Sequence, residues 1–247
     1  MNLWLVIARK DLLQAVRNRY LIGVLIISLL ISAGLRVIDF DTGTLASNEL
    51  PPVDFQALKF SIAVFSPFAI VCAFVVPLMM VEEKERQTLR FLQISPATIV
   101  DVLAGKALVG IVFCLAMSGM GLIFSGEASS GLSAASLAMV ALGSILFTGV
   151  GLLSSAFFQT SLQANTWAGI PVMVLFFGLI GEVLPLGSGL ANLVKLIPAH
   201  SASVLLRASL NGSATVEDFA IHVIYFGAWI AAIYALTIWL YQRSDHD

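Results

Sequence analysis

Residues 107–124 read ALVGIVFCLAMSGMGLIF, eighteen consecutive positions without a charged side chain. A helix of about 20 apolar residues crosses the hydrocarbon core of a bilayer, which is about 30 Å thick. The length and composition of this run therefore predict a transmembrane helix. Between Lys106 and Glu182 the only charged residue is Glu127. Further spans are therefore expected on the C-terminal side of residues 107–124.

The composition of the whole chain supports a membrane protein. Of the 247 residues, 59% are hydrophobic and 11% are charged, and the mean hydropathy is +0.96. Soluble domains have about 45–50% apolar and about 25% charged residues, so a single soluble domain is excluded. The net charge of −2 gives no indication of a nucleic-acid partner.

Six apolar stretches are long enough to span a membrane. We expect an all-α integral membrane protein that forms one transmembrane domain over residues 1–247. The predicted spans cover residues 20–37, 60–81, 107–124, 134–158, 166–183 and 219–241.

The basic residues that flank these spans predict their orientation, because Lys and Arg accumulate in cytoplasmic loops. If the N-terminus is cytoplasmic, nine basic residues lie on the cytoplasmic side and four on the other. We therefore expect a multi-pass protein of the cytoplasmic (inner) membrane with both termini in the cytoplasm.

The N-terminal segment, residues 1–19, combines apolar and basic residues at roughly helical spacing. This pattern predicts an amphipathic helix in the membrane interface, with its cations near anionic lipid headgroups. The alternative is simple anchoring of the first span by positive charge. The residues that would define the interfacial helix are Trp4, Arg9, Lys10, Arg17 and Arg19.

Residues 82–96 read EEKERQTLRFLQISP, and six of the first nine are charged. Glu82 and Arg86 have the i,i+4 spacing of a helical ion pair, and Ser95-Pro96 is typical of a helix start. The apolar residues Leu89 and Leu92 favour docking onto another protein or burial at the membrane interface. A charged loop that only enforces the topology is the alternative.

The segment 184–217 contains several Pro and Gly residues before the last span. We expect two short helices here, near residues 190–197 and 201–210. They either re-enter the membrane from the outer side or form a plain outer loop.

Motifs for catalysis, cofactors or metals are not recognisable. The nearest approach to an intramembrane hydrolase is Gly187-Ser188-Gly189 with His222, and the sequence has no phosphate-binding G-x-x-x-x-G-K-[ST] motif. Cys72 and Cys114 lie in apolar runs and are interpreted as small buried hydrophobic residues.

The segment after the second span resembles the permease subunits of the ABC-2 transporter family. That family has a run similar to E-K-E-x-G-T-L-E-x-L-x-x-S-P, followed by Gly-Lys, between its second and third spans. Gln87 and Arg90 depart from the family pattern, where Gly and Glu are frequent. The matching residues are Glu83-Lys84-Glu85-Arg86, Thr88-Leu89, Leu92, Ser95-Pro96 and Gly105-Lys106.

The resemblance implies a permease without its own ATP site, which pairs with a second permease subunit, identical or related, and with separate ABC ATPase subunits that bind ATP. It also implies transport, usually export, along the permease interface. An ion-coupled carrier, an assembly subunit and, less favoured, an intramembrane hydrolase are the alternatives. The implied ATPase-coupling residues are Glu82, Glu83, Lys84, Glu85, Arg86, Thr88, Leu89, Leu92, Ser95 and Pro96.

Overall fold

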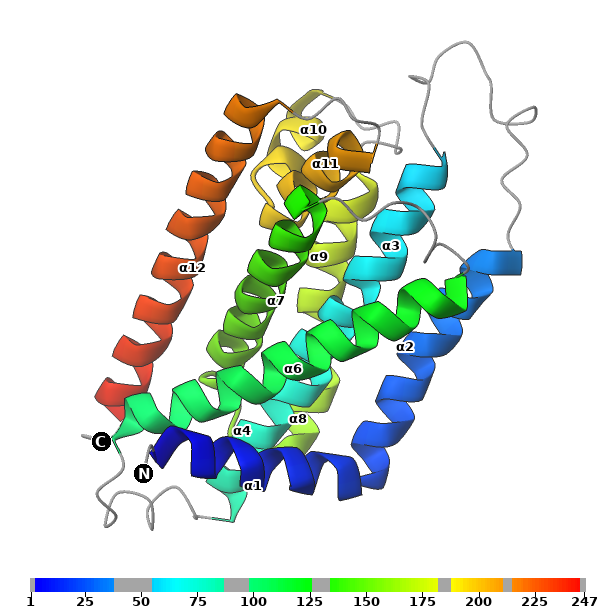
Figure 1. Ribbon diagram of the computed structural model, residues 1–247. Coiled ribbons are helices and arrows are strands. Elements are labelled where there is room, and N and C mark those ends of the chain that lie inside the picture. The colour runs from blue at the N-terminus through cyan, green and yellow to red at the C-terminus, as the bar shows by residue number, and fades with distance from the viewer. Residues whose placement is uncertain are drawn as a thin grey trace.

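Every element that the structure describes is a helix (Figure 1). The structure is a computed structural model, and it describes residues 3–37, 55–86, 98–125, 134–181, 188–210 and 215–244. The elements within these residues are α1 (Leu3–Arg17), α2 (Arg19–Val37), α3 (Phe55–Ile70), the π-helix η1 (Val71–Val75), α4 (Val76–Glu85), α6 (Ile99–Ser125), α7 (Ala134–Ser155), α8 (Ser161–Trp167), α9 (Gly169–Ile180), α10 (Ser188–Lys195), α11 (Pro198–Leu210) and α12 (Val216–Ser244).

Within the described residues, six helical segments are long and apolar enough to cross a membrane, which confirms the predicted fold class. The third begins at Ile99 rather than at residue 107, because Lys106 lies inside the protein beside two carboxylates instead of ending the span. The six segments are Arg19–Val37, Leu58–Glu85, Ile99–Ser125, Ala134–Ser155, Ser161–Ile180 and Phe219–Arg243.

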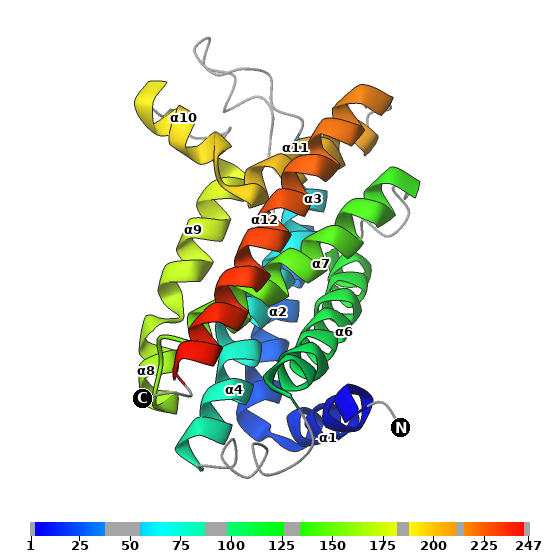
Figure 2. The same cartoon turned by 90° about the vertical axis from the view of Figure 1, so that its left-hand side faces the viewer.

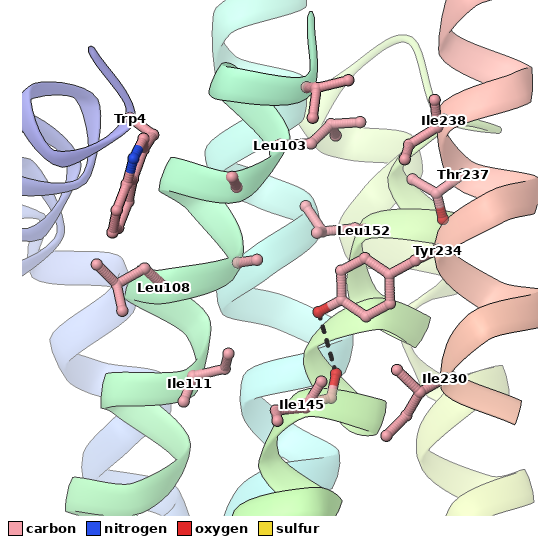
Figure 3. A pocket seen from close by; sticks show the side chains of 13 residues that line it. Trp4, Leu103, Leu108, Ile111, Ile145, Leu152, Ile230, Tyr234, Thr237 and Ile238 are labelled. Carbon is pink, nitrogen blue, oxygen red and sulfur yellow. Dashed lines mark hydrogen bonds between the residues drawn. The ribbon is translucent and has the colours of Figure 1, made fainter. Parts of the chain in front are cut away.

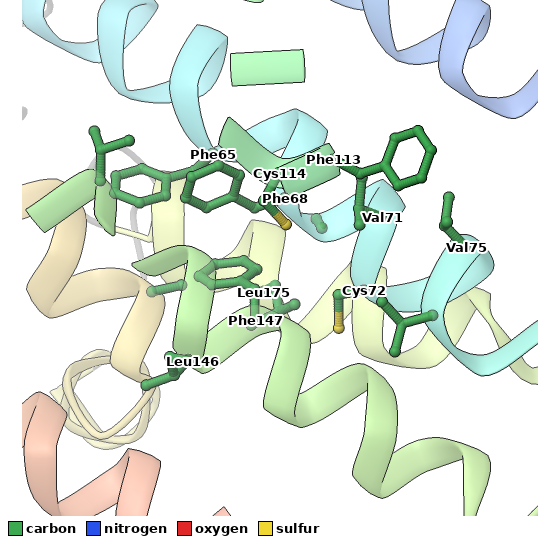
Figure 4. Packing of buried hydrophobic residues seen from close by; sticks show 14 of the residues in the cluster. Phe65, Phe68, Val71, Cys72, Val75, Phe113, Cys114, Leu146, Phe147 and Leu175 are labelled. Atoms are coloured by element: carbon green, nitrogen blue, oxygen red, sulfur yellow. The ribbon is translucent and has the colours of Figure 1, made fainter. Parts of the chain in front are cut away.

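The second span is the central helix of the bundle. Its most apolar window is 83% buried, whereas that of the last span is only 17% buried. Phe65 and Phe68 of this helix pack on Phe147 of α7, with ring centroids 6.0 and 5.6 Å from it (Figure 4). The free cysteines Cys72 and Cys114 are both buried, as predicted.

A π-helical turn interrupts the middle of this central helix. The amide of Val76 bonds to the carbonyl of Val71, and Pro77 has no N–H to continue the pattern to Cys72. The neighbouring helix approaches this carbonyl closely, since a Cβ on Gly151 would lie 2.6 Å from the Cys72 oxygen. Glycine at 151 thus lets α7 lie against the irregular turn.

Short helices occupy the two ends of the bundle. Figures 1 and 2 place α1 at one end, where it runs crosswise to the spans, and α10 and α11 at the other. The axes of α10 and α11 differ by 78°. Ala199, Ala202 and Leu206 of α11 are fully buried, so this helix closes its end of the bundle against α3, α7, α9 and α12.

Candidate functional site

The corner between α1 and α2 is built around Asn18. Its side-chain oxygen accepts a hydrogen bond from the amide of Tyr20, as an N-cap of α2 does. Its side-chain nitrogen donates to Glu82 of α4 over 3.1 Å. One side-chain amide therefore caps the start of the first span and links the α1–α2 corner to the second span.

Four charged side chains meet where α1, α4 and α6 converge, and we call them the charge cluster: Lys10, Asp11, Glu83 and Lys106. The ammonium group of Lys106 lies 3.1 Å from Asp11 and 3.1 Å from Glu83, and it also donates to the carbonyl of Met79. Lys10 lies 2.6 Å from Glu83 and 3.3 Å from Asp11. Two cations and two anions thus alternate in one closed group.

Burial makes the balance of charges in this cluster important. The side chains of Lys106, Asp11 and Glu83 are 1%, 3% and 9% exposed, whereas that of Lys10 is 53% exposed. Burial lowers the pKa of Lys10, but its hydrogen bond to Glu83 and the nearby charges of Asp11 and Glu83 outweigh this and leave the pKa above its ordinary value. The two carboxylates therefore favour the charged form of Lys10.

Gly105 explains how α1 reaches this cluster. A Cβ at this position would lie 2.9 Å from the backbone oxygen of Trp4 and 3.0 Å from the side chain of Ile7. The absence of a side chain lets α1 pack directly on α6. The Gly105-Lys106 pair thus supplies both the contact surface for α1 and the charge that holds Asp11.

The next two residues of α4 bind the other side of the bundle. Lys84 donates to the carbonyls of Ser155 and Phe158 at the end of α7 and lies 4.9 Å from the ring centroid of Tyr241 of α12. Glu85 accepts from the backbone and the hydroxyl of Ser161, the first residue of α8. Lys84 thus binds the last carbonyl of α7 and a carbonyl of the turn that follows it.

Successive helical residues point about 100° apart, so the four consecutive charged residues of α4 reach different neighbours. Glu82 binds the α1–α2 corner, Glu83 the charge cluster, Lys84 the end of α7, and Glu85 the start of α8. We call residues 82–85 the α4 hub. The structure brings four of the ten predicted coupling residues, 82–85, into side-chain contacts within the chain.

Other sequence predictions for this segment have mixed outcomes. Glu82 and Arg86, both described, form no ion pair, because Glu82 bonds to Asn18 instead. The helix that enters the third span begins at Ile99, three residues later than Ser95-Pro96 predicts. Thr98 is its N-cap, in a reciprocal pair of hydrogen bonds with Asp101. The coupling residues Thr88, Leu89, Leu92, Ser95 and Pro96 lie outside the described residues.

The predicted interfacial residues lie on different sides of α1 and at its end. Trp4 is half-buried against α6, Lys10 belongs to the charge cluster, and Arg9 and Arg17 are exposed. Arg19 is exposed at the first position of α2. That α1 is a helix is a structural fact, and its position in a membrane interface stays a prediction.

Trp4 also lies at the edge of an apolar groove of about 510 Å³ between α6, α7 and α12 (Figure 3). The hydroxyl of Tyr234 donates to the carbonyl of Ile145, and that of Thr237 donates to Ile233. Both hydroxyl groups therefore have hydrogen-bond partners inside the chain, and the lining of the groove is apolar.

Sequence reasoning missed two members of the charge cluster. Asp11 stood unremarked among basic residues, although it is the only acid between residues 3 and 37. Lys106 directly precedes the predicted third span, where a basic residue is expected to face the cytoplasm, yet it is buried. A lone acid on a basic helix, and a lysine eight residues inside an apolar helix, were the signals that could have pointed to them.

The candidate hydrolase residues and possible metal ligands lie only partly in the part of the chain that the structure describes. No three His, Cys, Asp or Glu residues of that part come together as metal ligands would. His222 is half-buried on α12, while the side chain of Ser188 lies outside the described residues.

Comparison with known proteins identifies the class. The family model described as "ABC-2 family transporter protein" matches residues 5–246. The chain therefore belongs to the ABC-2 transporter family, and it is a multi-pass membrane protein of the permease type, as its sequence motif indicated. No curated protein matches the chain.

Proposed function

We propose that this chain is the permease subunit of an ABC exporter, which works as a dimer with a second permease subunit and takes its energy from a separate ATPase subunit. The ATPase binds at the α1 end of the bundle, and this end faces the cytoplasm. Its contact is the coupling segment, residues 82–96. Family membership supports a permease and, in general, an ATPase partner.

The α4 hub is the observation that carries this proposal. It immediately precedes the apolar part of the coupling segment and holds α1, α6, α7 and α8 by hydrogen bonds and ion pairs. A force applied beyond Arg86 reaches α4 first, and through the hub it reaches most of the bundle. Packed helices respond to such a force by rigid shifts between discrete arrangements.

The chemistry of ATP hydrolysis belongs to the partner in this proposal. The charge cluster of this chain has no net formal charge, and its ion pairs connect α1, α4 and α6. Such a cluster can transmit movement from one of these helices to the others. Motion enters at the coupling segment, passes through the α4 hub, and alters the packing of the second and third spans along which the substrate moves.

Co-purification with a co-expressed ABC ATPase subunit tests the proposal. We expect the double variant Leu89→Asp/Leu92→Asp to lose the ATPase, because two new carboxylates would oppose the burial of an apolar contact. Reconstituted in liposomes, the wild-type complex should transport only with ATP, and the variant should lose substrate-stimulated ATP hydrolysis.

The matched control is Leu190→Asp/Leu193→Asp, which changes two exposed leucines, 58% and 60% accessible, at the opposite end. This control should retain the ATPase. If the coupling variant retains it as well, the coupling segment is assigned wrongly. Transport driven by an ion gradient in the absence of ATP would show instead that the chain is a carrier.

A further inference from the structure

We infer that the polar groove between α1 and α4 is a binding site for the headgroup of an anionic glycerophospholipid. The groove has a volume of about 770 Å³. Its described lining is the stripe Lys10, Leu13, Gln14 and Arg17 of α1, the corner residues Asn18 and Arg19, and Glu82 and Arg86 at the end of the second span.

Among the described residues that line this groove, basic side chains outnumber acidic ones. Lys10 is held by Glu83 and Asp11, and the one acid of the groove, Glu82, accepts from Asn18. Arg17, Arg19 and Arg86 are exposed, and within the described parts of the chain none of them forms an ion pair. In the described lining, three guanidinium groups thus border a depression to which Glu82 contributes the one carboxylate.

Guanidinium groups bind phosphate oxygens through paired, charge-assisted hydrogen bonds. The groove is therefore complementary to a phosphate-bearing anion. Gln14 and Asn18 add amide groups beside the arginines, which suits the glycerol and phosphate oxygens of a headgroup.

The position of the arginines selects a lipid over other sources of phosphate. Arg19 is the first residue of the span Arg19–Val37, and Arg86 directly follows the span Leu58–Glu85. Both span ends lie where α1 crosses the bundle (Figure 1). Lipid phosphates form the layer next to the hydrocarbon, so they lie at the level of these span ends.

Native mass spectrometry of the full chain in a neutral detergent tests this site without any ATPase present. The probes are phosphatidylglycerol and phosphatidylcholine with identical acyl chains. We expect one phosphatidylglycerol to bind at least about tenfold more tightly than phosphatidylcholine. Each arginine near a membrane surface contributes about fivefold, so Arg17→Gln/Arg19→Gln/Arg86→Gln should weaken phosphatidylglycerol binding roughly a hundredfold.

The matched control removes three arginines that do not line the groove, Arg9→Gln/Arg36→Gln/Arg243→Gln. It should change phosphatidylglycerol binding by less than about threefold, because surface charge alone is weak and screened. Equal losses in the two triple variants would show a nonspecific effect of net charge and overturn the site. The single variant Arg86→Gln, at an exposed position, should lose about fivefold, and it covers the case in which the triple variant does not fold.

Two further measurements distinguish a bound lipid from a small anion and from the protein partner. Excess inorganic phosphate should not displace the lipid, and full displacement would reduce the groove to a small-anion site. If the triple variant keeps phosphatidylglycerol but no longer co-purifies with the ATPase subunit, the groove binds the protein partner and the lipid assignment is wrong. Failure of the lipid titration leaves the proposed permease function untouched, because the titration involves no ATPase.

Discussion

At the scale of single residues, Asp11 and Lys106 decide how the crosswise helix is attached. An ammonium group buried in an apolar helix would be very costly alone, and Lys106 is stable because Asp11 and Glu83 both lie 3.1 Å from it. The ion pair between Asp11 and Lys106 also makes the position of α1 depend on its contact with α6. Neither residue could be recognised as a partner of the other from a sequence in which 95 positions separate them.

We expect Asp11→Asn to lower the free energy of unfolding by about 3–5 kcal/mol, because it leaves the cluster with an unbalanced buried positive charge. Thermal unfolding of the purified chain in detergent measures the effect. The double variant Asp11→Asn/Lys106→Gln restores neutrality and should cost less than the sum of the two single changes.

Arg9→Gln is the control for this prediction, because Arg9 is exposed on the same helix outside the cluster. It should change stability by less than about 0.5 kcal/mol. An equally small effect of Asp11→Asn would contradict the role assigned to the cluster.

At the scale of elements, the close contact between α1 and α6 depends on one glycine. The nearest atom to a Cβ at Gly105 is the backbone oxygen of Trp4, which cannot rotate away as a side chain can. A larger residue must therefore move one helix as a whole.

We expect Gly105→Leu to destabilise the packing of α1 on α6 by about 1–3 kcal/mol, the usual cost of overpacking. Hydrogen exchange detected by mass spectrometry should become faster in residues 3–17, while the central span stays protected. Gly119→Leu on the same helix is the matched control, since a Cβ there meets nothing within 4 Å. Unchanged protection of residues 3–17 in Gly105→Leu would rule out this contact as the anchor.

At the scale of the whole molecule, the two ends of the bundle differ in kind. The α1 end contains the charge cluster, the α4 hub and the polar groove, whereas α10 and α11 lie at the opposite end (Figure 2). The first and last described helices, α1 and α12, begin and end at the same side, which agrees with an even number of spans.

Cysteine labelling tests the proposed orientation of these ends. A membrane-impermeant maleimide should label Asn192→Cys on α10 in intact cells and Gln242→Cys on α12 only after the membrane is opened. Both positions are exposed, and the native cysteines are buried and should give little background. The opposite pattern would reverse the proposed orientation and place the α4 hub outside the cytoplasm.

The sequence by itself determined the class of the fold. Transfer of apolar side chains from water is a local property that adds up along a helix, so runs such as residues 107–124 reveal their spans without knowledge of their neighbours. The approximate extents of α1, α10 and α11 followed from local spacing and from Pro and Gly. The family motif around Glu83–Arg86 was likewise readable from order alone.

Only the tertiary structure decided what the charges in that motif contact. A run of charged residues next to a span predicts a solvated helix that faces outward. In the structure, however, Glu83 is buried against Lys106, and Lys84 donates to a carbonyl at the end of α7. Ion pairs and close helix contacts depend on distances between segments far apart in the chain, such as Asp11 and Lys106. Helix packing sets those distances, and sequence spacing contains no information on them.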